Sequence, residues 1–211
     1  MDLNTDDVSV YHNIRNELQE YANEIGILIN NAGVLLDKPG RYLDLSEDEV
    51  MQNVRVNISA LLMVTRAILP FMVNNKRGLI INMSSASAVK PLPYTGVYSA
   101  SKKFVEFFGS ALGYEYKNDN IHVLTLVPSY VSTKMVQFSK FLSKPSFIIP
   151  SAKTFVSSAI STIGHTEHTT GYWAHGIYWF CIQYFSPMFA YQFFASKFLT
   201  SQQPKVESSR V

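Results

Sequence analysis

Three short, continuous apolar runs punctuate the chain, at residues 25–30, 78–85 and 121–128. Each is bounded by turn-forming residues. Continuous apolar runs of this length are typical of strands that are buried on both faces of a parallel sheet. The pattern therefore predicts three parallel strands.

Segments with apolar positions at helical spacing lie before, between and after these runs. Ser46 followed by Glu49 matches a capping box at the start of the second segment, from which we expect one uninterrupted helix. The alternation predicts an α/β fold, a Rossmann-like doubly wound parallel sheet with helices on both faces. The expected helices cover residues 8–24, 47–74, 95–117 and 151–163.

Turn residues follow each predicted strand. Asn30-Asn31-Ala32-Gly33 follows the first, Ser84-Ser85 the second and Pro128-Ser129 the third. Ligands of doubly wound sheets bind at the carboxyl ends of the strands. The sequence therefore predicts a binding site at this edge of the sheet.

Four polar residues near this edge could carry chemistry. Tyr98 and Lys102 are four residues apart and so share one helix face. A free tyrosine has a pKa near 10, and a nearby ammonium should lower it. Ser85 ends a strand, and Asn57 lies inside a helix, where asparagine is not favoured. Taken singly, each residue has a plain structural explanation; the order and spacing of the set make a reaction centre the better hypothesis.

The order Asn30-Asn31-Ala32-Gly33, Asn57, Ser85 and Tyr98-x-x-x-Lys102 resembles the short-chain dehydrogenase/reductase family. The resemblance runs from about residue 2 to 165. The stretches "IGILINNAG", "VPSYVSTKM" and "TTGYWAHG" are similar to the branch that holds 17-beta-hydroxysteroid dehydrogenases and very-long-chain 3-oxoacyl-CoA reductases.

The resemblance implies an oxidoreductase that interconverts a carbonyl and an alcohol. Tyr98 is then the general acid, and Lys102 lowers its pKa and binds the nicotinamide ribose. Ser85 polarises the substrate carbonyl, and Asn57 keeps a water in a proton relay.

The resemblance also implies a cofactor, NADP(H) or NAD(H), with NADP(H) slightly favoured. Asp2 would contact adenine, and Tyr98 and Lys102 the nicotinamide side. Ser129 stands where the family has glycine. The other implied cofactor contacts are Asn31, Ala32 and Gly33 for adenosine, and Pro128, Val131 and Thr133 for the nicotinamide end.

The glycine-rich turn G-x-x-x-G-x-G, which holds the pyrophosphate in this family, is not in the sequence. Residue 2 matches a position near the end of the family's third strand, so the resemblance is to an N-terminally truncated member. We expect an exposed apolar edge on the remaining sheet. Two hypotheses stay open: a fragment or shortened form of a complete enzyme, or a non-catalytic isoform that binds a partner.

The C-terminal part of the sequence differs in kind. Residues 168–196 contain no Asp, Glu, Lys or Arg and are rich in aromatics. We divide the chain into a partial dehydrogenase domain (1–165), an aromatic substrate-lid or membrane-interface segment (166–200) and a polar tail (201–211). A true membrane span over 168–196 is the less favoured alternative, because Pro187 and polar residues interrupt it.

The segments expected to cover the substrate, residues 135–150 and the C-terminal aromatics, are apolar. They suit a bulky lipid-like carbonyl substrate, such as a 3-oxoacyl-CoA of fatty acid elongation or a steroid. Lys134, Lys140 and Lys144 could meet CoA phosphates, although solvated surface lysines are the simpler explanation for each. The resemblance implies the cytosolic face of the endoplasmic reticulum membrane, and a homo-oligomer formed through the helices that carry Asn57 and Tyr98.

Composition sets the remaining limits. The chain is 47% apolar and 16% charged, with a net charge of +2, which does not favour a nucleic-acid partner. Cys181 is the single cysteine, so an intramolecular disulfide and a cysteine-based metal site are excluded, and we expect no metal.

Overall fold

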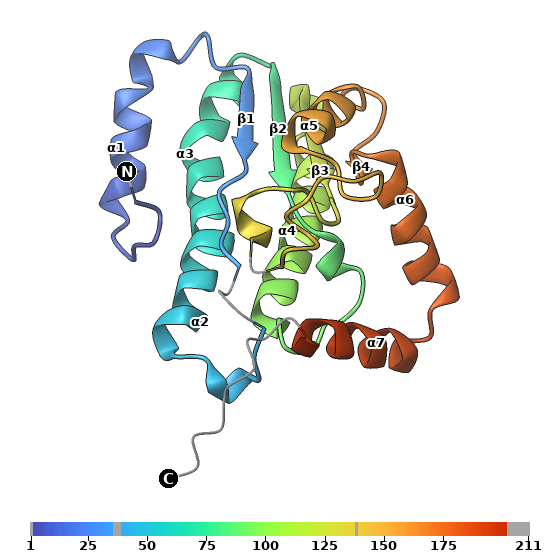
Figure 1. The fold of residues 1–211 in the computed structure, drawn as a ribbon. Coiled ribbons are helices and arrows are strands. Elements are labelled where there is room, and N and C mark those ends of the chain that lie inside the picture. Colours follow the sequence, from blue (N-terminus) through green and yellow to red (C-terminus); the bar gives the residue numbers. More distant parts are fainter. Residues whose placement is uncertain (1, 36–38, 138, 202–211) are drawn as a thin grey trace.

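The computed structural model describes residues 2–35, 39–137 and 139–201 (Figure 1). Its centre is a parallel sheet in the order β1-β2-β3-β4. The three predicted strands and the Rossmann-like α/β class are confirmed. A fourth strand of two residues pairs with the end of the third and was not predicted, because two residues carry no periodicity. The strands are β1 (Ile27–Asn30), β2 (Gly78–Met83), β3 (Ile121–Leu126) and β4 (His168–Thr169).

Helices cover the two faces of the sheet unequally. One face packs against α1, α3 and α4, and its core contains Met72, Ile80 and Val123. The other face packs against α5, through Phe155 and Ala159. The helices are α1 (Ser9–Glu17), α2 (Glu47–Val54), α3 (Ala60–Asn74), α4 (Gly96–Glu115), α5 (Ala152–Ile160), α6 (Trp173–Phe180) and α7 (Met188–Ser201).

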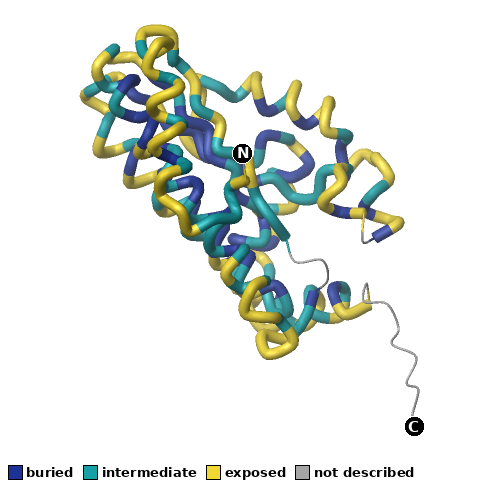
Figure 2. Tube along the Cα trace, turned by 90° about the vertical axis from the view of Figure 1, so that its left-hand side faces the viewer, coloured by how far each residue is buried: buried dark blue, intermediate teal, exposed yellow. Residues whose placement is uncertain are grey.

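Shorter helical turns connect these elements. Figure 2 shows that buried residues gather in the interior, which includes β2, β3 and the inward sides of the helices, whereas the outward sides of the helices are exposed. The 3₁₀ turns are Gln19–Tyr21, Tyr42–Asp44, Ala86–Ala88, Lys117–Asp119 and Lys134–Val136, and the π-helical segments are Arg55–Ser59 and Cys181–Phe185.

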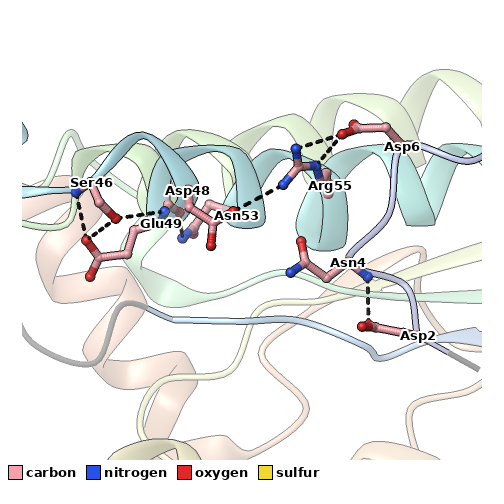
Figure 3. Close-up of polar contacts among 8 residues, drawn as sticks. All are labelled: Asp2, Asn4, Asp6, Ser46, Asp48, Glu49, Asn53 and Arg55. Carbon is pink, nitrogen blue, oxygen red and sulfur yellow. Dashed lines mark hydrogen bonds and ion pairs between the residues drawn. The ribbon is translucent and has the colours of Figure 1, made fainter.

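The long second helix begins as predicted but is not regular. Ser46 Oγ accepts a hydrogen bond from the Glu49 amide at 3.2 Å, and Glu49 Oε2 accepts one from the Ser46 amide at 2.8 Å, which completes the capping box (Figure 3). A π-helical segment, Arg55–Ser59, then joins α2 to α3, so the helix predicted over 47–74 forms, but with an irregular segment that the sequence did not predict. Within it, Arg55 pairs with Asp6 at 2.6 Å and ties the N-terminal segment to the helix (Figure 3).

One described helix, Glu47–Asn74, is long and apolar enough to cross a membrane by length and composition. More than half of its apolar window is buried inside the protein, where it packs against the sheet as a core helix. The uncharged stretch 168–196 is instead divided between β4, α6 and α7, with an extended residue, Ser186, before α7.

The outer edge of the sheet is exposed, as expected. Among the strands in the described residues, β1 pairs with β2 alone. Leu28 packs into the core below α3, whereas Ile27 and Ile29, on the opposite face, are 62% and 59% exposed. The helix that covers this face, α5, packs over β2 and β3 and leaves the apolar side chains of β1 in contact with solvent.

Candidate active site

The loops at the carboxyl ends of β1, β2 and β3 meet around a cavity of about 660 Å³. Helices α4, α5, α6 and α7 also contribute to its walls. Residues predicted from separate parts of the sequence come together here: Asn31, Ala32, Gly33, Ser85, Tyr98, Lys102, Pro128, Val131 and Thr133 all line it. The predicted binding edge of the sheet is therefore a real concavity.

Helix α4 supplies Tyr98 and Lys102, one helical turn apart and both buried. Lys102 Nζ lies 5.7 Å from the centroid of the Tyr98 ring. It also donates a hydrogen bond of 3.0 Å to the carbonyl oxygen of Met83, the last residue of β2. The ammonium is thus anchored to the strand end, beside the tyrosine.

The electrostatics differ from the sequence expectation. Burial raises the pKa of Tyr98, and a hydrogen bond with Ser85 lowers it by less. Burial also lowers the pKa of Lys102 to about 8. We expected the ammonium to lower the pKa of Tyr98, but removal from water penalises the charged form of both groups and dominates. In this structure Tyr98 is a neutral hydroxyl at pH 7.

Ser85 lies where the strand becomes a turn. Its Oγ accepts a hydrogen bond from the Ser87 amide at 3.2 Å, capping the short 3₁₀ turn. The next amide, that of Ala86, donates to the Pro128 carbonyl oxygen at 2.8 Å. This bond joins the loop after β2 to the loop after β3 and fixes the serine at the cavity wall.

Asn57 lies in the π-helical segment and is buried. Its Oδ1 accepts from the Val34 amide at 2.8 Å, and its Nδ2 lies 2.9 Å from the Val34 carbonyl oxygen. A Cβ atom added to Gly33 would lie 3.3 Å from Asn57 Oδ1 and 3.1 Å from Lys102 Nζ. The φ of Gly33 is not positive, so its backbone conformation does not require glycine. Glycine is needed here because a side chain would crowd Asn57 and Lys102. A relay water on Asn57 stays a prediction; the amide is already bonded to the loop.

Asp2 does not reach the cavity walls. It is exposed, and its Oδ1 accepts a hydrogen bond of 2.9 Å from the Asn4 amide (Figure 3). A contact between Asp2 and adenine stays a prediction. Asp2 itself is not among the residues that line the cavity.

Several cavity residues were not predicted. Tyr130, Tyr178 and Tyr191 line it from the loop after β3, from α6 and from α7. His175 is buried behind that loop; its Nδ1 accepts from the Ser129 amide at 3.2 Å, and its Nε2 lies 3.2 Å from the Tyr130 carbonyl oxygen. Tyr130 is a single aromatic in a loop, and the other three lie in a stretch rich in aromatics, so no spacing distinguished these residues from core residues.

Comparison with known proteins agrees with this geometry. A family model described as short chain dehydrogenase matches residues 1–140. The chain therefore belongs to the short chain dehydrogenase family.

Two curated relatives show which branch is similar. The chain is 41% identical over 175 residues to the inactive hydroxysteroid dehydrogenase-like protein 1 of Homo sapiens, covering 83% of this chain and 52% of that protein. It is 39% identical over 179 residues to the very-long-chain 3-oxoacyl-CoA reductase of Rattus norvegicus, covering 84% and 55%. The chain thus spans about half the length of the curated relatives it matches.

A solved structure has the same fold. The short-chain dehydrogenase from Sphingobium yanoikuyae in complex with NADPH superposes with a TM-score of 0.70 at 23% identity, covering 99% of this chain and 76% of that chain. At this identity the likeness establishes the fold.

Proposed function

We propose that this protein is an NAD(P)(H)-dependent oxidoreductase that reduces or oxidises a lipid-like carbonyl or alcohol. The proposal rests on one observation: Ser85, Tyr98 and Lys102 line a single cavity at the carboxyl ends of the strands. Carbonyl reduction requires a proton donor and groups that stabilise the oxygen, and Tyr98, Ser85 and Lys102 could supply these.

Tyr98 is the proposed general acid. Because burial raises its pKa, the hydroxyl holds its proton at neutral pH and donates it to the substrate oxygen. Ser85 donates a second hydrogen bond to the same oxygen. The Lys102 ammonium stabilises the tyrosinate that remains, and Asn57 holds the loop that carries Gly33 against the lysine.

The walls of the cavity suit the nicotinamide side of a dinucleotide, which would supply the hydride. The absent side chain of Gly33 leaves open the approach to Lys102 Nζ. We assign the adenosine side to Asp2, Asn31, Ala32 and Gly33, and the nicotinamide side to Tyr98, Lys102, Pro128, Val131 and Thr133. NADP(H) is slightly favoured over NAD(H).

The remaining lining points to an apolar substrate. Leu92, Val136, Val156 and Leu199 contribute to the wall beyond Tyr98. An apolar wall with a few polar groups is characteristic of sites for lipid-like molecules. We propose a 3-oxoacyl-CoA or a steroid as the substrate class; Lys134, also on the wall, is the lysine placed to meet a phosphate.

We further propose that α6 and α7 rest on a membrane surface. Phe180, Phe185, Phe189 and Phe194 are at least half exposed, in a stretch without charged residues. Exposed aromatics of this density suit the interfacial region of a bilayer. The cytosolic face of the endoplasmic reticulum is the proposed location. A homo-oligomer through the helix that carries Asn57 (Glu47–Asn74) and the helix that carries Tyr98 (α4) is the proposed assembly.

A second function deserves a test, because the sequence lacks the glycine-rich turn and a similar relative is named inactive. In this alternative the chain does not hold the cofactor and acts by binding a partner. Ile27 and Ile29, exposed on β1, would provide the apolar contact.

The deciding experiment titrates the purified 211-residue chain with NADPH and NADH and follows nucleotide fluorescence. Micromolar binding, followed by turnover of a ketone that falls about 10²–10⁴-fold in Tyr98→Phe, supports the enzyme. A circular dichroism spectrum of Tyr98→Phe that matches that of the parent controls for folding. A folded chain that binds neither nucleotide would exclude catalysis for this form and favour the partner-binding alternative.

A further inference from the structure

Two neighbouring lysines on α4 have opposite surroundings. The side chain of Lys103 is 45% exposed, and its Nζ forms an ion pair of 3.0 Å with Glu106 Oε2. Lys102 is only 4% exposed, and among the residues that the structure describes no carboxylate forms an ion pair with it. A buried ammonium without a counter-ion loses hydration that no opposite charge replaces. The surroundings of Lys102 therefore favour the neutral amine more than water does.

The Lys102 amine has room for a bond to a ligand. Lys102 and Gly33 both line the cavity. A Cβ atom added to Gly33 would lie 3.1 Å from Lys102 Nζ, so the absence of a side chain there leaves space beside the nitrogen. Nζ donates a hydrogen bond of 3.0 Å to the Met83 carbonyl oxygen. A neutral amine that donates this bond still has its lone pair for attack on an electrophile.

A proton donor for such a reaction lies beside the amine. Tyr98 is one helical turn before Lys102, and its ring centroid is 5.7 Å from Nζ. Burial raises the pKa of Tyr98, so its hydroxyl keeps its proton at neutral pH and can give it to a leaving oxygen. Ser85 lines the same cavity and brings a second hydroxyl. Nucleophile and acid thus face one cavity without any added group.

We propose that Lys102 is a nucleophilic amine that forms an imine with an apolar aldehyde in the cavity. Lysines desolvated in apolar pockets form such Schiff bases with carbonyl compounds. Nζ adds to the carbonyl carbon, and the carbonyl oxygen takes the proton that the nitrogen loses, which gives a carbinolamine. Its hydroxyl leaves as water with a proton from Tyr98, while the nitrogen lone pair forms the C=N bond. The remaining nitrogen proton then returns to the Tyr98 oxygen, so one amine and one aldehyde give one imine and one water.

The cavity favours an aldehyde with a long apolar chain. Its volume is about 660 Å³, and several apolar residues contribute to its wall: Leu92, Val136, Val156 and Leu199. Walls of this kind bind the apolar part of a ligand, while a few polar groups fix its reacting end. An aldehyde suits the buried amine better than a ketone, because its carbonyl carbon is less crowded. The reaction requires no nucleotide, so it goes beyond the proposed function.

The test traps the imine by reduction. The chain is incubated at pH 7, without nucleotide, with decanal and sodium cyanoborohydride, which reduces an imine to a stable secondary amine. Peptide mass spectrometry locates the adducts and separates Lys102 from the other lysines and from the terminal amine. Burial lowers the pKa of Lys102 to about 8, so its share of free amine is about 10²-fold that of an ordinary lysine. Lys102 should be labelled at least about tenfold faster than any other lysine, and at least about tenfold faster by decanal than by propanal.

Lys103→Arg is the matched control, because it removes the neighbouring exposed lysine and should leave the labelling of Lys102 unchanged. Lys102→Met should lose the fast adduct. If Lys102→Met does not fold, the peptide map of the parent chain still decides. Labelling spread evenly over the exposed lysines, a preference for Lys134 on the same cavity, or equal rates with decanal and propanal would overturn the proposal. Because the assay contains no nucleotide, its outcome does not depend on whether the chain is an active oxidoreductase.

Discussion

Ile29 and Ile81 are register partners on neighbouring parallel strands, and their side chains are on the same face of the sheet. Ile81 is 7% exposed and packs beneath α5, whereas Ile29 is 59% exposed. Both residues lie in apolar runs that predict buried strands. The comparison shows that an apolar run predicts a strand of a parallel sheet. Whether a given face of that strand is buried depends on a helix from elsewhere in the chain, here α5, packing over it.

Replacing Ile81 and Ile29 separately with alanine should give the largest difference in the free energy of unfolding. Ile81→Ala should lower the free energy of unfolding by about 2–5 kcal/mol, since it removes packed methyl groups and leaves a cavity. Ile29→Ala should change it by less than about 1 kcal/mol. Urea unfolding of the two variants gives the difference. Equal losses would mean that the outer face of β1 is covered in solution.

Buried Lys102, at the candidate active site, should make the stability of the protein depend on pH, which the uncharged exposed edge at β1 should not. Burial lowers the pKa of Lys102 in the folded state to about 8, from an ordinary value of 10.5. Between these values the unfolded chain binds more protons, so stability should rise with pH from about 8 to 10.5. Below pH 8 the buried Lys102 is protonated in the folded chain, and this lowers the free energy of unfolding by about 3 kcal/mol.

Lys102→Met removes this contribution. The free energy of unfolding of the parent, relative to that of the variant, should increase by about 2–3 kcal/mol between pH 7 and pH 10.5. Urea titrations at several pH values measure it. Parallel curves for the two proteins would show that Lys102 has an ordinary pKa and is hydrated.

Close packing of the covered region gives the smallest expected effect. A Cβ atom on Gly109, in α4, would lie 2.5 Å from Thr125 Oγ1 and 3.1 Å from Asn82 Nδ2. Gly109→Ala should therefore cost about 1–3 kcal/mol through overpacking. Gly96→Ala, at the start of the same helix, meets nothing within 4 Å and should be neutral or slightly stabilising. Thermal unfolding of the pair measures the difference; a Gly109→Ala variant as stable as the parent would contradict this packing.

Asn30 belongs to the predicted turn motif but has a structural role, which the sequence did not predict. It belongs to the Asn30-Asn31-Ala32-Gly33 turn, yet its Nδ2 donates to Thr65 Oγ1 at 3.0 Å and to Asn82 Oδ1 at 2.9 Å. It thus joins β1 to β2 and α3. Only the residues after it in the motif line the cavity. The sequence predicted the location of the turn, whereas the division between structural and cavity-lining residues depended on the directions of side chains.

The sequence alone determined the parallel α/β fold, the strand ends that carry the site, and the placement of Tyr98 and Lys102 on one helix face. Local periodicity and i,i+4 geometry are sufficient for these. Only the tertiary structure decided that burial outweighs the ammonium at Tyr98, that Asp2 is not among the cavity-lining residues, and that Tyr130, Tyr178 and Tyr191 line the same cavity as Tyr98. These outcomes depend on desolvation and on contacts between residues distant in the chain, which no local spacing encodes.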